Sequence, residues 1–239
     1  MSRLSRMPRR RSYDQYCAAA RALDAVGDRW TLLIVRELLA GPRRYTDLHA
    51  DLPGVSTDVL ASRLKDMERD ELATRRKLPP PAAAYVYELT ERGRGLLPVL
   101  TALARWGAPA LSERRPTDAV RAHWFAVPLL RALSAAPGGQ EGRPAAGEPA
   151  GVLEVRLDEG VFHMRLGGGT EAAGTGGTGG AGEAVYGDGP AERPDACLAL
   201  DSVACRELSD GSLTVADGVR AGRIEVSGDG VLAKALRGE

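Results

Sequence analysis

This chain has few aromatic residues, few cysteines and no long apolar run, and each shortage limits what kind of protein it can be. Aromatic side chains make up 5% of the 239 residues, so we expect cores built from Leu, Val and Ala. Cys17, Cys197 and Cys205 are odd in number and lack a CxxC pair, which argues against a disulfide framework and for a reducing compartment. No segment approaches the roughly 18 apolar residues of a membrane span. We therefore expect a cytoplasmic protein without a membrane partner.

Signals of catalysis are also missing. The three histidines lie far apart without metal-ligand spacing, and neither Cys197 nor Cys205 has a histidine nearby in the sequence. Residues 167–182 hold nine glycines in sixteen positions but lack the GK[ST] of a phosphate-binding loop, so we interpret them as a flexible connection. We expect no catalytic residue, no metal and no cofactor. An enzyme with its site in the C-terminal half is the alternative that measurable turnover would support.

The net charge of zero conceals two halves of opposite sign. Residues 1–115 hold 21 Lys and Arg against 14 Asp and Glu, whereas residues 116–239 hold 11 against 18. Such a split predicts two domains with different partners, and the basic half suits phosphates. Residues 1–11 contain five arginines with no apolar segment after them, so we expect a disordered basic arm rather than a secretory signal.

Apolar periodicity and capping residues predict helices in the basic half. Ser12 is the expected cap of the first helix and Ser56 that of the fourth, in which Leu60, Leu64 and Met67 share one face. Two strands with a Pro- and Ala-rich tip follow, and then a fifth helix. The expected helices span 12–26, 30–40, 45–50, 57–71 and 90–106, and the strands 72–78 and 85–89. Two short helices, a tight turn and a basic β-wing are the parts of a winged helix-turn-helix, which places one helix in the DNA major groove.

The acidic half has a different pattern. A helix is expected over 117–136 and a Gly- and Pro-rich linker over 137–150, after which the apolar period changes to two. The expected strands are 152–157, 161–166, 196–200 and 224–226, and the expected helices are 202–208 and 231–236. This order predicts an α+β layer.

Several polar residues of the basic half have the chemistry that DNA binding requires. Hydroxyls at a helix start can meet phosphate, and side chains further along can reach base edges. Taken singly, each arginine is better explained as a solvated surface charge than as a DNA contact. Together in this architecture they indicate a DNA interface. The candidates are Arg43, Arg44, Ser56, Thr57, Ser62, Arg63, Lys65, Arg75, Arg76 and Lys77.

The basic half resembles the HxlR-type family of bacterial winged-helix regulators. The resemblance covers about residues 13–107 and is carried by Cys17, ALDAVGDRWTLLI (22–34), RRY (43–45), LASRL (60–64) and YELTERG (87–93). It implies a homodimeric transcription regulator whose first helix and 90–106 helix form much of the dimer interface. It also implies a palindromic double-stranded DNA operator, because the two-fold symmetry of the protein is mirrored in the DNA.

Two positions within this resemblance need comment. The family usually has a basic residue just before the returning wing strand, where this chain has Ala82-Ala83-Ala84, which implies a weaker grip on the minor groove. Cys17 occupies the position of a redox- or electrophile-sensing thiol in several members, and Arg21 one turn later would favour the thiolate. The alternative is a small apolar residue inside a dimer helix.

The acidic half resembles the sterol-carrier-protein-like domain, through LSDG (208–211) and GRIEVSGDG (222–230). That resemblance implies a sheet with helices on one side and an apolar tunnel for a lipid-like effector; a closed structural core is the alternative. The expected domains are an arm at 1–11, a DNA-binding and dimerisation domain at 12–112, a helix and linker at 113–150, and a smaller α+β domain at 151–239.

The sequence therefore predicts an α+β protein that regulates transcription as a dimer, under the control of a hydrophobic ligand or of Cys17 modification. The alternative is a carrier of lipids or hydrophobic ligands with weak or vestigial DNA binding. Steep salt dependence of specific duplex binding favours the regulator. Salt-insensitive ligand uptake favours the carrier.

Overall fold

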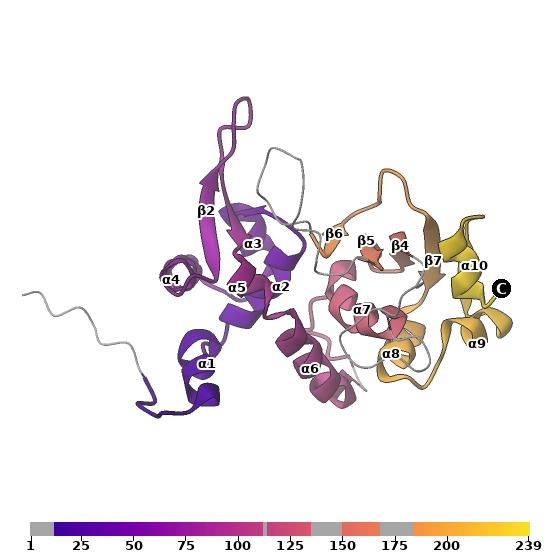
Figure 1. The fold of residues 1–239 in the computed structure, drawn as a ribbon, viewed down its shortest axis with the longest axis horizontal. Coiled ribbons are helices and arrows are strands. Elements are labelled where there is room, and N and C mark those ends of the chain that lie inside the picture. The colour runs from indigo at the N-terminus through magenta and orange to yellow at the C-terminus, as the bar shows by residue number, and fades with distance from the viewer. Residues whose placement is uncertain (1–11, 112–113, 135–149, 168–183) are drawn as a thin grey trace, which may run out of the picture.

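Two lobes, each with its own β-sheet, lie side by side (Figure 1). The computed structural model describes residues 12–111, 114–134, 150–167 and 184–239. The predicted basic arm, most of the 137–150 linker and nearly all of the glycine tract lie outside the described residues. Among the helices that the structure describes, none is long and apolar enough to cross a membrane.

The N-terminal lobe contains the predicted helices and wing. Its strands form an antiparallel sheet in the order β1-β3-β2, with Arg43 opposite Tyr87 and Arg75 opposite the same tyrosine from the other side. The elements are α1 (Ala18–Val26), α2 (Thr31–Leu39), β1 (Arg43–Arg44), α3 (Tyr45–Asp51), α4 (Thr57–Arg69), β2 (Ala73–Lys77), β3 (Tyr85–Leu89), α5 (Glu91–Arg94), α6 (Leu97–Gly107) and the 3₁₀ helix η1 (Ala108–Leu111).

The core of this lobe confirms the expected inner face of the fourth helix. Leu60, Leu64 and Met67 are fully buried in the hydrophobic core, which also contains Ile34 and Val35 of α2. Gly93 in α5 lies so close to the strand segment that a Cβ there would be 2.0 Å from the carbonyl oxygen of Leu72. Only glycine therefore lets α5 approach the wing.

Two helix boundaries in this lobe differ from the prediction. The first helix begins at Ala18, because the Ser12 hydroxyl donates to Asp24 Oδ2 (2.9 Å) and the chain before the helix folds back onto that carboxylate. Ser12 is therefore not a helix cap. The helix expected over 90–106 is divided into α5 and α6, since Pro98 has no N–H for the carbonyl of Arg94.

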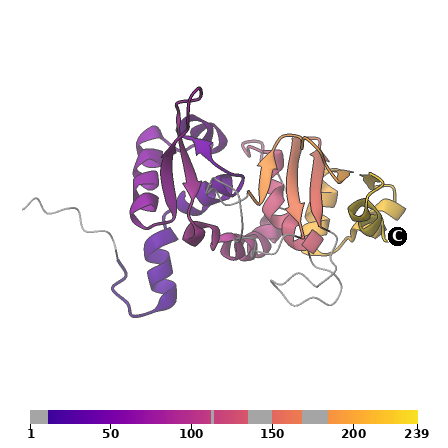
Figure 2. The same cartoon turned by 45° about the horizontal axis from the view of Figure 1, so that its top comes forward.

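The C-terminal lobe is a five-stranded sheet in the order β6-β5-β4-β7-β8. β4 and β7 are parallel and the other pairs antiparallel. Helices α7 and α8 cover one face, and α9 and α10 pack at the β7–β8 end (Figure 2). The elements are η2 (Ala122–Phe125), α7 (Ala126–Ser134), β4 (Gly151–Leu157), β5 (Gly160–Leu166), β6 (Tyr186–Asp188), β7 (Ala196–Leu200), α8 (Ser202–Asp210), α9 (Val215–Arg220), β8 (Ile224–Ser227) and α10 (Val231–Arg237).

The structure confirms the expected hairpin, the strands at 196–200 and 224–226, and the helix that follows each of these two strands. The single helix over 117–136 is wrong: η2 begins at Ala122 and α7 at Ala126. A continuous helix would place Pro128 in its interior, where proline lacks the donor for the carbonyl of Trp124, whereas α7 has Pro128 in its first turn. β1, β6 and α9 were not predicted.

Candidate nucleic-acid interface

The connection between α3 and α4 fixes the orientation of α4 relative to α3. Leu52 and Val55 are buried beneath it, and Gly54 turns the chain with φ +86°, which favours glycine. The Tyr45 hydroxyl donates to the carbonyl oxygen of Thr57 (2.8 Å) and ties the start of α3 to the start of α4. The two helices therefore form one rigid unit.

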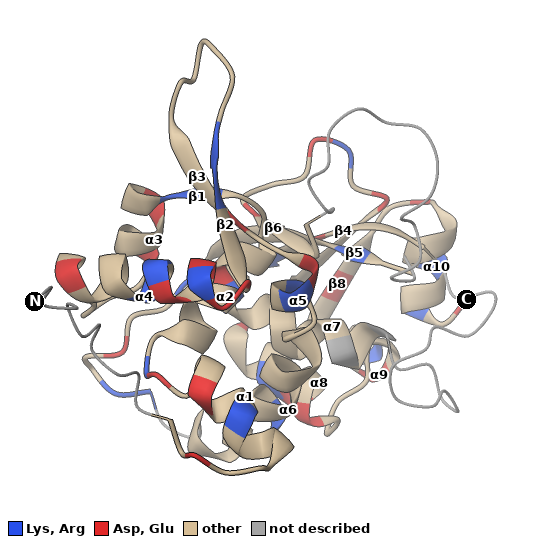
Figure 3. Cartoon of the chain, turned by 60° about the vertical axis from the view of Figure 1, so that its left-hand side comes forward, with Lys and Arg blue, Asp and Glu red and all other residues tan. Residues whose placement is uncertain are grey.

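The outer face of α4 is exposed, as expected for a helix that enters a groove. Ser56 is its N-cap, accepting from the Val59 N–H at 3.4 Å, as predicted. Ser56, Thr57, Ser62 and Lys65 are all exposed. Both acidic and basic segments lie along the helix (Figure 3), so its outer surface is not uniformly basic.

Arg63 is less exposed than the sequence suggested. Its side chain is 21% exposed, and its guanidinium pairs with Asp28 and, at 2.9 Å, with Asp66. These carboxylates hold the base-reading candidate against the protein surface. To reach a base it must exchange at least one of them for the DNA.

The wing has two exposed cations and one that is paired. Arg75 and Lys77 are exposed, and the Arg75 guanidinium lies 4.0 Å from the ring centre of Tyr85. Arg76 donates through Nε (3.1 Å) and Nη2 (3.1 Å) to the two oxygens of Glu88, which raises the pKa of Arg76. Arg75 and Lys77 are therefore the exposed cations of the first wing strand.

The two arginines of β1 differ in the same way. Arg44 is exposed, whereas the Arg43 side chain is 17% exposed and lies 4.0 Å from Asp51. The structure thus brings seven of the ten DNA-binding candidates to the solvent side of α3, α4 and the wing, and places Arg43, Arg63 and Arg76 against carboxylates.

Cys17 lies at the N-cap position of α1 and is exposed. Hydrogen bonds from the backbone N–H groups of Ala20 and Ala19 lower the pKa of the Cys17 thiol. Arg21, which we expected to favour the thiolate, lies 3.8 Å from Asp24. The helix start, more than the arginine, gives this thiol its acidity.

Apolar side chains remain exposed on α1, on the segment before it and on α6. Tyr16 and Trp106 are the most exposed, at 106% and 84%. Leu23, Val99 and Leu103 are also exposed on these two helices. Large apolar side chains gathered on two elements are typical of a protein–protein contact.

A buried polar contact between the lobes was missed by the sequence reasoning. Glu37 of α2 is 0% and His123 of η2 1% exposed, and His123 Nε2 lies 2.7 Å from Glu37 Oε2. The other oxygen of Glu37 accepts from Trp124 Nε1 (2.9 Å) and Arg36 Nε (2.8 Å). A glutamate within the apolar face of α2 was the signal that could have revealed it.

The surroundings set the charge state of this contact. Burial raises the pKa of Glu37, but the hydrogen bond with His123 and the charge of Arg36 outweigh it and hold that pKa below its ordinary value. Burial and the nearby Glu37 charge raise the pKa of Asp51. His123 Nδ1 lies 3.4 Å from Asp188, so both ring nitrogens face carboxylates.

Glu37, Asp51 and His123 each bring a ligand-type atom within 4.8 Å of the others, and such atoms can hold a divalent metal. Glu37 already accepts from Arg36, and Arg121 Nε lies 3.6 Å from Asp51 Oδ1. Since guanidinium groups already neutralise the carboxylates, we assign no metal to them.

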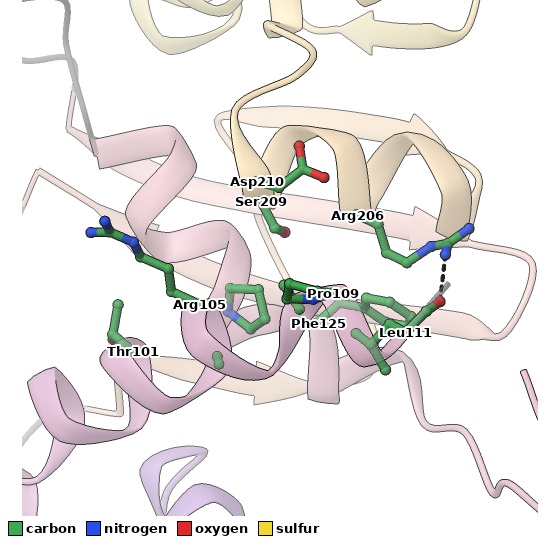
Figure 4. Close-up of a pocket in the computed structure, with 11 residues that line it drawn as sticks. Thr101, Arg105, Pro109, Leu111, Phe125, Arg206, Ser209 and Asp210 are labelled. Carbon is green, nitrogen blue, oxygen red and sulfur yellow. Dashed lines mark hydrogen bonds between the residues drawn. The ribbon is translucent and has the colours of Figure 1, made fainter. Parts of the chain in front are cut away.

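A pocket of about 230 Å³ lies where α6 and η1 meet α7 and α8 (Figure 4). Ala104, Phe125 and Pro128 give it apolar walls, and Arg206 at its edge donates to the carbonyl oxygen of Leu111 (2.5 Å). It lies between the lobes rather than inside the C-terminal sheet layer, where the sequence suggested a tunnel.

The packed helices, the turn before α4 and the wing beside it define a winged helix-turn-helix DNA-binding protein. Residues 25–115 match the family model described as HxlR-like helix-turn-helix. The chain is 36% identical over 86 residues to the uncharacterized HTH-type transcriptional regulator YvaP of Bacillus subtilis (strain 168), covering 36% of this chain and 80% of that protein. It belongs to the HxlR family of helix-turn-helix transcription regulators.

A second relative is the HTH-type transcriptional regulator YodB of the same organism, 35% identical over 85 residues, which cover 36% of this chain and 76% of that protein. Among solved structures, the reduced form of YodB from B. subtilis is 30% identical, with 42% of this chain and 100% of that chain covered and a TM-score of 0.37. The family match and the two relatives place this chain in the class of DNA-binding transcription regulators.

Proposed function

We propose that the protein is a homodimeric regulator that binds a palindromic operator, with α4 in the major groove and the wing against the neighbouring backbone. The exposed face of α4 is the observation that carries this proposal. Ser62 and Lys65 lie on it, one helical turn apart, where a groove-bound helix presents side chains to base edges. Arg75 and Lys77 add the cations that fix register on phosphates.

The start of α4 is the proposed phosphate site. Ser56 and Thr57 expose hydroxyls there, and the first N–H groups of a thirteen-residue helix carry partial positive charge. Arg44, exposed at the start of α3, suits a flanking phosphate. Arg43, Arg63 and Arg76 bind DNA in this proposal only after giving up a carboxylate partner.

Selection from a random duplex library tests the function. We expect an enriched palindrome, and an affinity for it that falls steeply with salt because bound phosphates release counterions. A scrambled duplex of the same length and composition is the control. Equal affinity for both duplexes at every salt concentration would exclude sequence-specific binding and favour the ligand-carrier alternative.

The proposed dimer interface is the exposed apolar surface on α1 and α6. Trp106→Glu is expected to give a monomer in sedimentation, because a buried unpaired charge opposes association. Val231→Glu, on another exposed apolar residue in α10, is the matched control. A Trp106→Glu protein that stays dimeric would place the interface elsewhere.

Control by a hydrophobic ligand in a sterol-carrier-like C-terminal lobe remains a proposal, and the pocket between α6 and α8 is the site we favour for the ligand. Repeating the duplex selection with a hydrophobic cell extract tests it. Ala104→Phe fills the pocket without changing charge and is expected to abolish the effect of the extract. An effect that survives this substitution would place the ligand in another part of the molecule.

Thiol chemistry at Cys17 is the other proposed input. The exposed thiol of lowered pKa supports it, since the thiolate is the reactive form. Alkylating the protein and measuring operator affinity tests the idea, with Cys17→Ser as the unreactive control. Unchanged affinity after complete alkylation would leave Cys17 as a structural residue.

A further inference from the structure

The contact between the lobes has a one-sided hydrogen-bonding pattern. The N-terminal lobe contributes acceptors, which are the Glu37 carboxylate and the main-chain carbonyl oxygens of Arg36, Leu39 and Ala50. The C-terminal lobe faces them with donor groups. These are the indole of Trp124, the hydroxyl of Tyr186, the main-chain N–H of Val185, the guanidinium of Arg121 and the ring of His123.

The positions of the acceptors explain this pattern. The last four carbonyl groups of a helix have no partner within it. Arg36 and Leu39 belong to the last turn of α2, and Ala50 belongs to the last turn of α3. The Val185 N–H donates to the carbonyl oxygen of Leu39 (3.2 Å) and Arg121 Nη2 to that of Ala50 (3.5 Å), so the C-terminal lobe caps the ends of both helices.

Charge favours the same arrangement. A helix C-terminus carries partial negative charge, which attracts cations. Arg121 lies at the end of α3 beside Asp51, and Arg36 stacks 4.3 Å from the ring centre of Trp124 while it pairs with Glu37. The Glu37 carboxylate and the ends of the two helices thus form one continuous surface of acceptors, which the donors of the C-terminal lobe complement.

We propose that the C-terminal ends of α2 and α3, centred on Glu37, are a docking surface for residues 121–124 and 185–188 of the same chain, and that docking there holds the helix-turn-helix in its DNA-binding form. The second half of this statement rests on the proposed function. Release of the C-terminal lobe then lowers operator affinity, which gives that lobe control of DNA binding.

The path from the docking surface to the DNA is short. Asp51 ends α3, and the turn over 52–56 leads directly to Thr57, the first residue of α4. Tyr45 holds the other end of α3 to Thr57. A displacement of the end of α3 therefore moves the start of α4, where Ser56 and Thr57 are proposed to meet phosphate.

Hydrogen exchange of the full-length protein measures docking without DNA. Arg121→Gln removes the cation at the end of α3, and Glu37→Gln removes the central charge at nearly constant volume. We expect faster exchange at 185–188 and in the last turn of α2 in both variants, with β4 and β5 unchanged. Arg220→Gln is the control, because Arg220 is an exposed arginine of α9 that pairs with Asp217 of the same helix.

Operator affinity of the same variants measures the coupling. We expect about a tenfold loss in Arg121→Gln and Glu37→Gln, a typical coupling between two sites, and none in Arg220→Gln. Unchanged exchange in both variants would overturn docking. Faster exchange with unchanged affinity would overturn the control of DNA binding. If the wild-type protein selects no duplex, the proposed function fails, and the exchange result alone decides docking.

Discussion

Two of the places where arginines face carboxylates in this molecule differ in their surroundings. On α4 and the wing, Arg63 and Arg76 pair with acids at a surface open to water. Between the lobes, Arg36 and His123 face Glu37, which no solvent reaches. A pair in water is screened and exchanges easily for another anion, whereas a buried charge that loses its partner is costly. The first arrangement suits reversible DNA binding, and the second suits holding two lobes together.

The buried contact is where substitution is expected to cost most. His123→Ala leaves Glu37 Oε2 without its partner, and we expect a loss of about 3–5 kcal/mol in the free energy of unfolding, as for other broken buried pairs. Urea denaturation followed by circular dichroism measures it. His163→Ala, at a half-buried histidine of β5, is the control and should cost less.

A double substitution separates charge from packing in this contact. If Glu37 and His123 are both replaced by leucine, no buried charge is left unpaired; Arg36 and Asp188 each lose a partner, but their side chains are 18% and 46% exposed, so part of the lost stability should return. Comparable losses in the single and double variants would show that the contact depends on shape rather than on the pair.

Acid should weaken the contact through Glu37. The pKa of this carboxyl is lower in the folded protein than its ordinary value of 4.5, so its stabilisation is complete above that value and is lost as the pH falls through the lowered one. The raised pKa of Asp51 acts in the opposite sense. Unfolding measured from pH 6 to pH 3 should therefore show a larger acid loss in wild type than in Glu37→Gln, and equal losses would contradict this assignment.

At the exposed surface of α4 and the wing, substitution of the basic residues is expected to affect DNA binding rather than stability. If Arg63 reads a base, Arg63→Ala should cost about 1–3 kcal/mol on the selected operator and relax the preference at one position. Lys77→Ala, at an exposed wing cation that is proposed to contact phosphate, should weaken all duplexes alike and reduce the salt slope by about one. Fluorescence anisotropy with selected and scrambled duplexes distinguishes the two. Equal weakening by Arg63→Ala would make that residue a phosphate contact.

Capping within α4 gives a smaller effect with a control in the same helix. Ser56→Ala removes the acceptor of the Val59 N–H and should lower the free energy of unfolding by about 1 kcal/mol. Ser62→Ala, on the exposed face, should not destabilise the protein, because alanine is the better helix former. Thermal unfolding of the two variants tests whether Ser56 has its capping role.

Sequence alone predicted the parts whose causes are local. The cap at Ser56 and the apolar spacing of Leu60, Leu64 and Met67 lie within one helix, and the hairpin of β4 and β5 is set by alternation across a short turn. The contact of His123 with Glu37 joins residues 86 positions apart. No local pattern encodes such a pair, because it depends on how the two lobes meet.

The partners of individual side chains could not be predicted from the sequence for the same reason. The helix that contains Arg63 was predicted, but Asp28, which holds its guanidinium, is 35 positions earlier in the chain. β6 is three residues long and begins beyond the glycine tract, too short for alternation to show. Composition and period place a residue on a face, whereas its partner is fixed only by tertiary structure.

The smallest effect is expected at the wing. Arg76 contacts Glu88 through two of its nitrogens (3.1 Å each), as Arg36 contacts Glu37, yet the Arg76 side chain is 40% exposed and water can replace either partner. Arg76→Gln should leave the midpoint of thermal unfolding unchanged within error, and Arg36→Gln should lower it clearly. Equal shifts would mean that burial does not decide how much each pair contributes to stability. A lower operator affinity in Arg76→Gln with an unchanged midpoint would show that this pair opens to bind DNA.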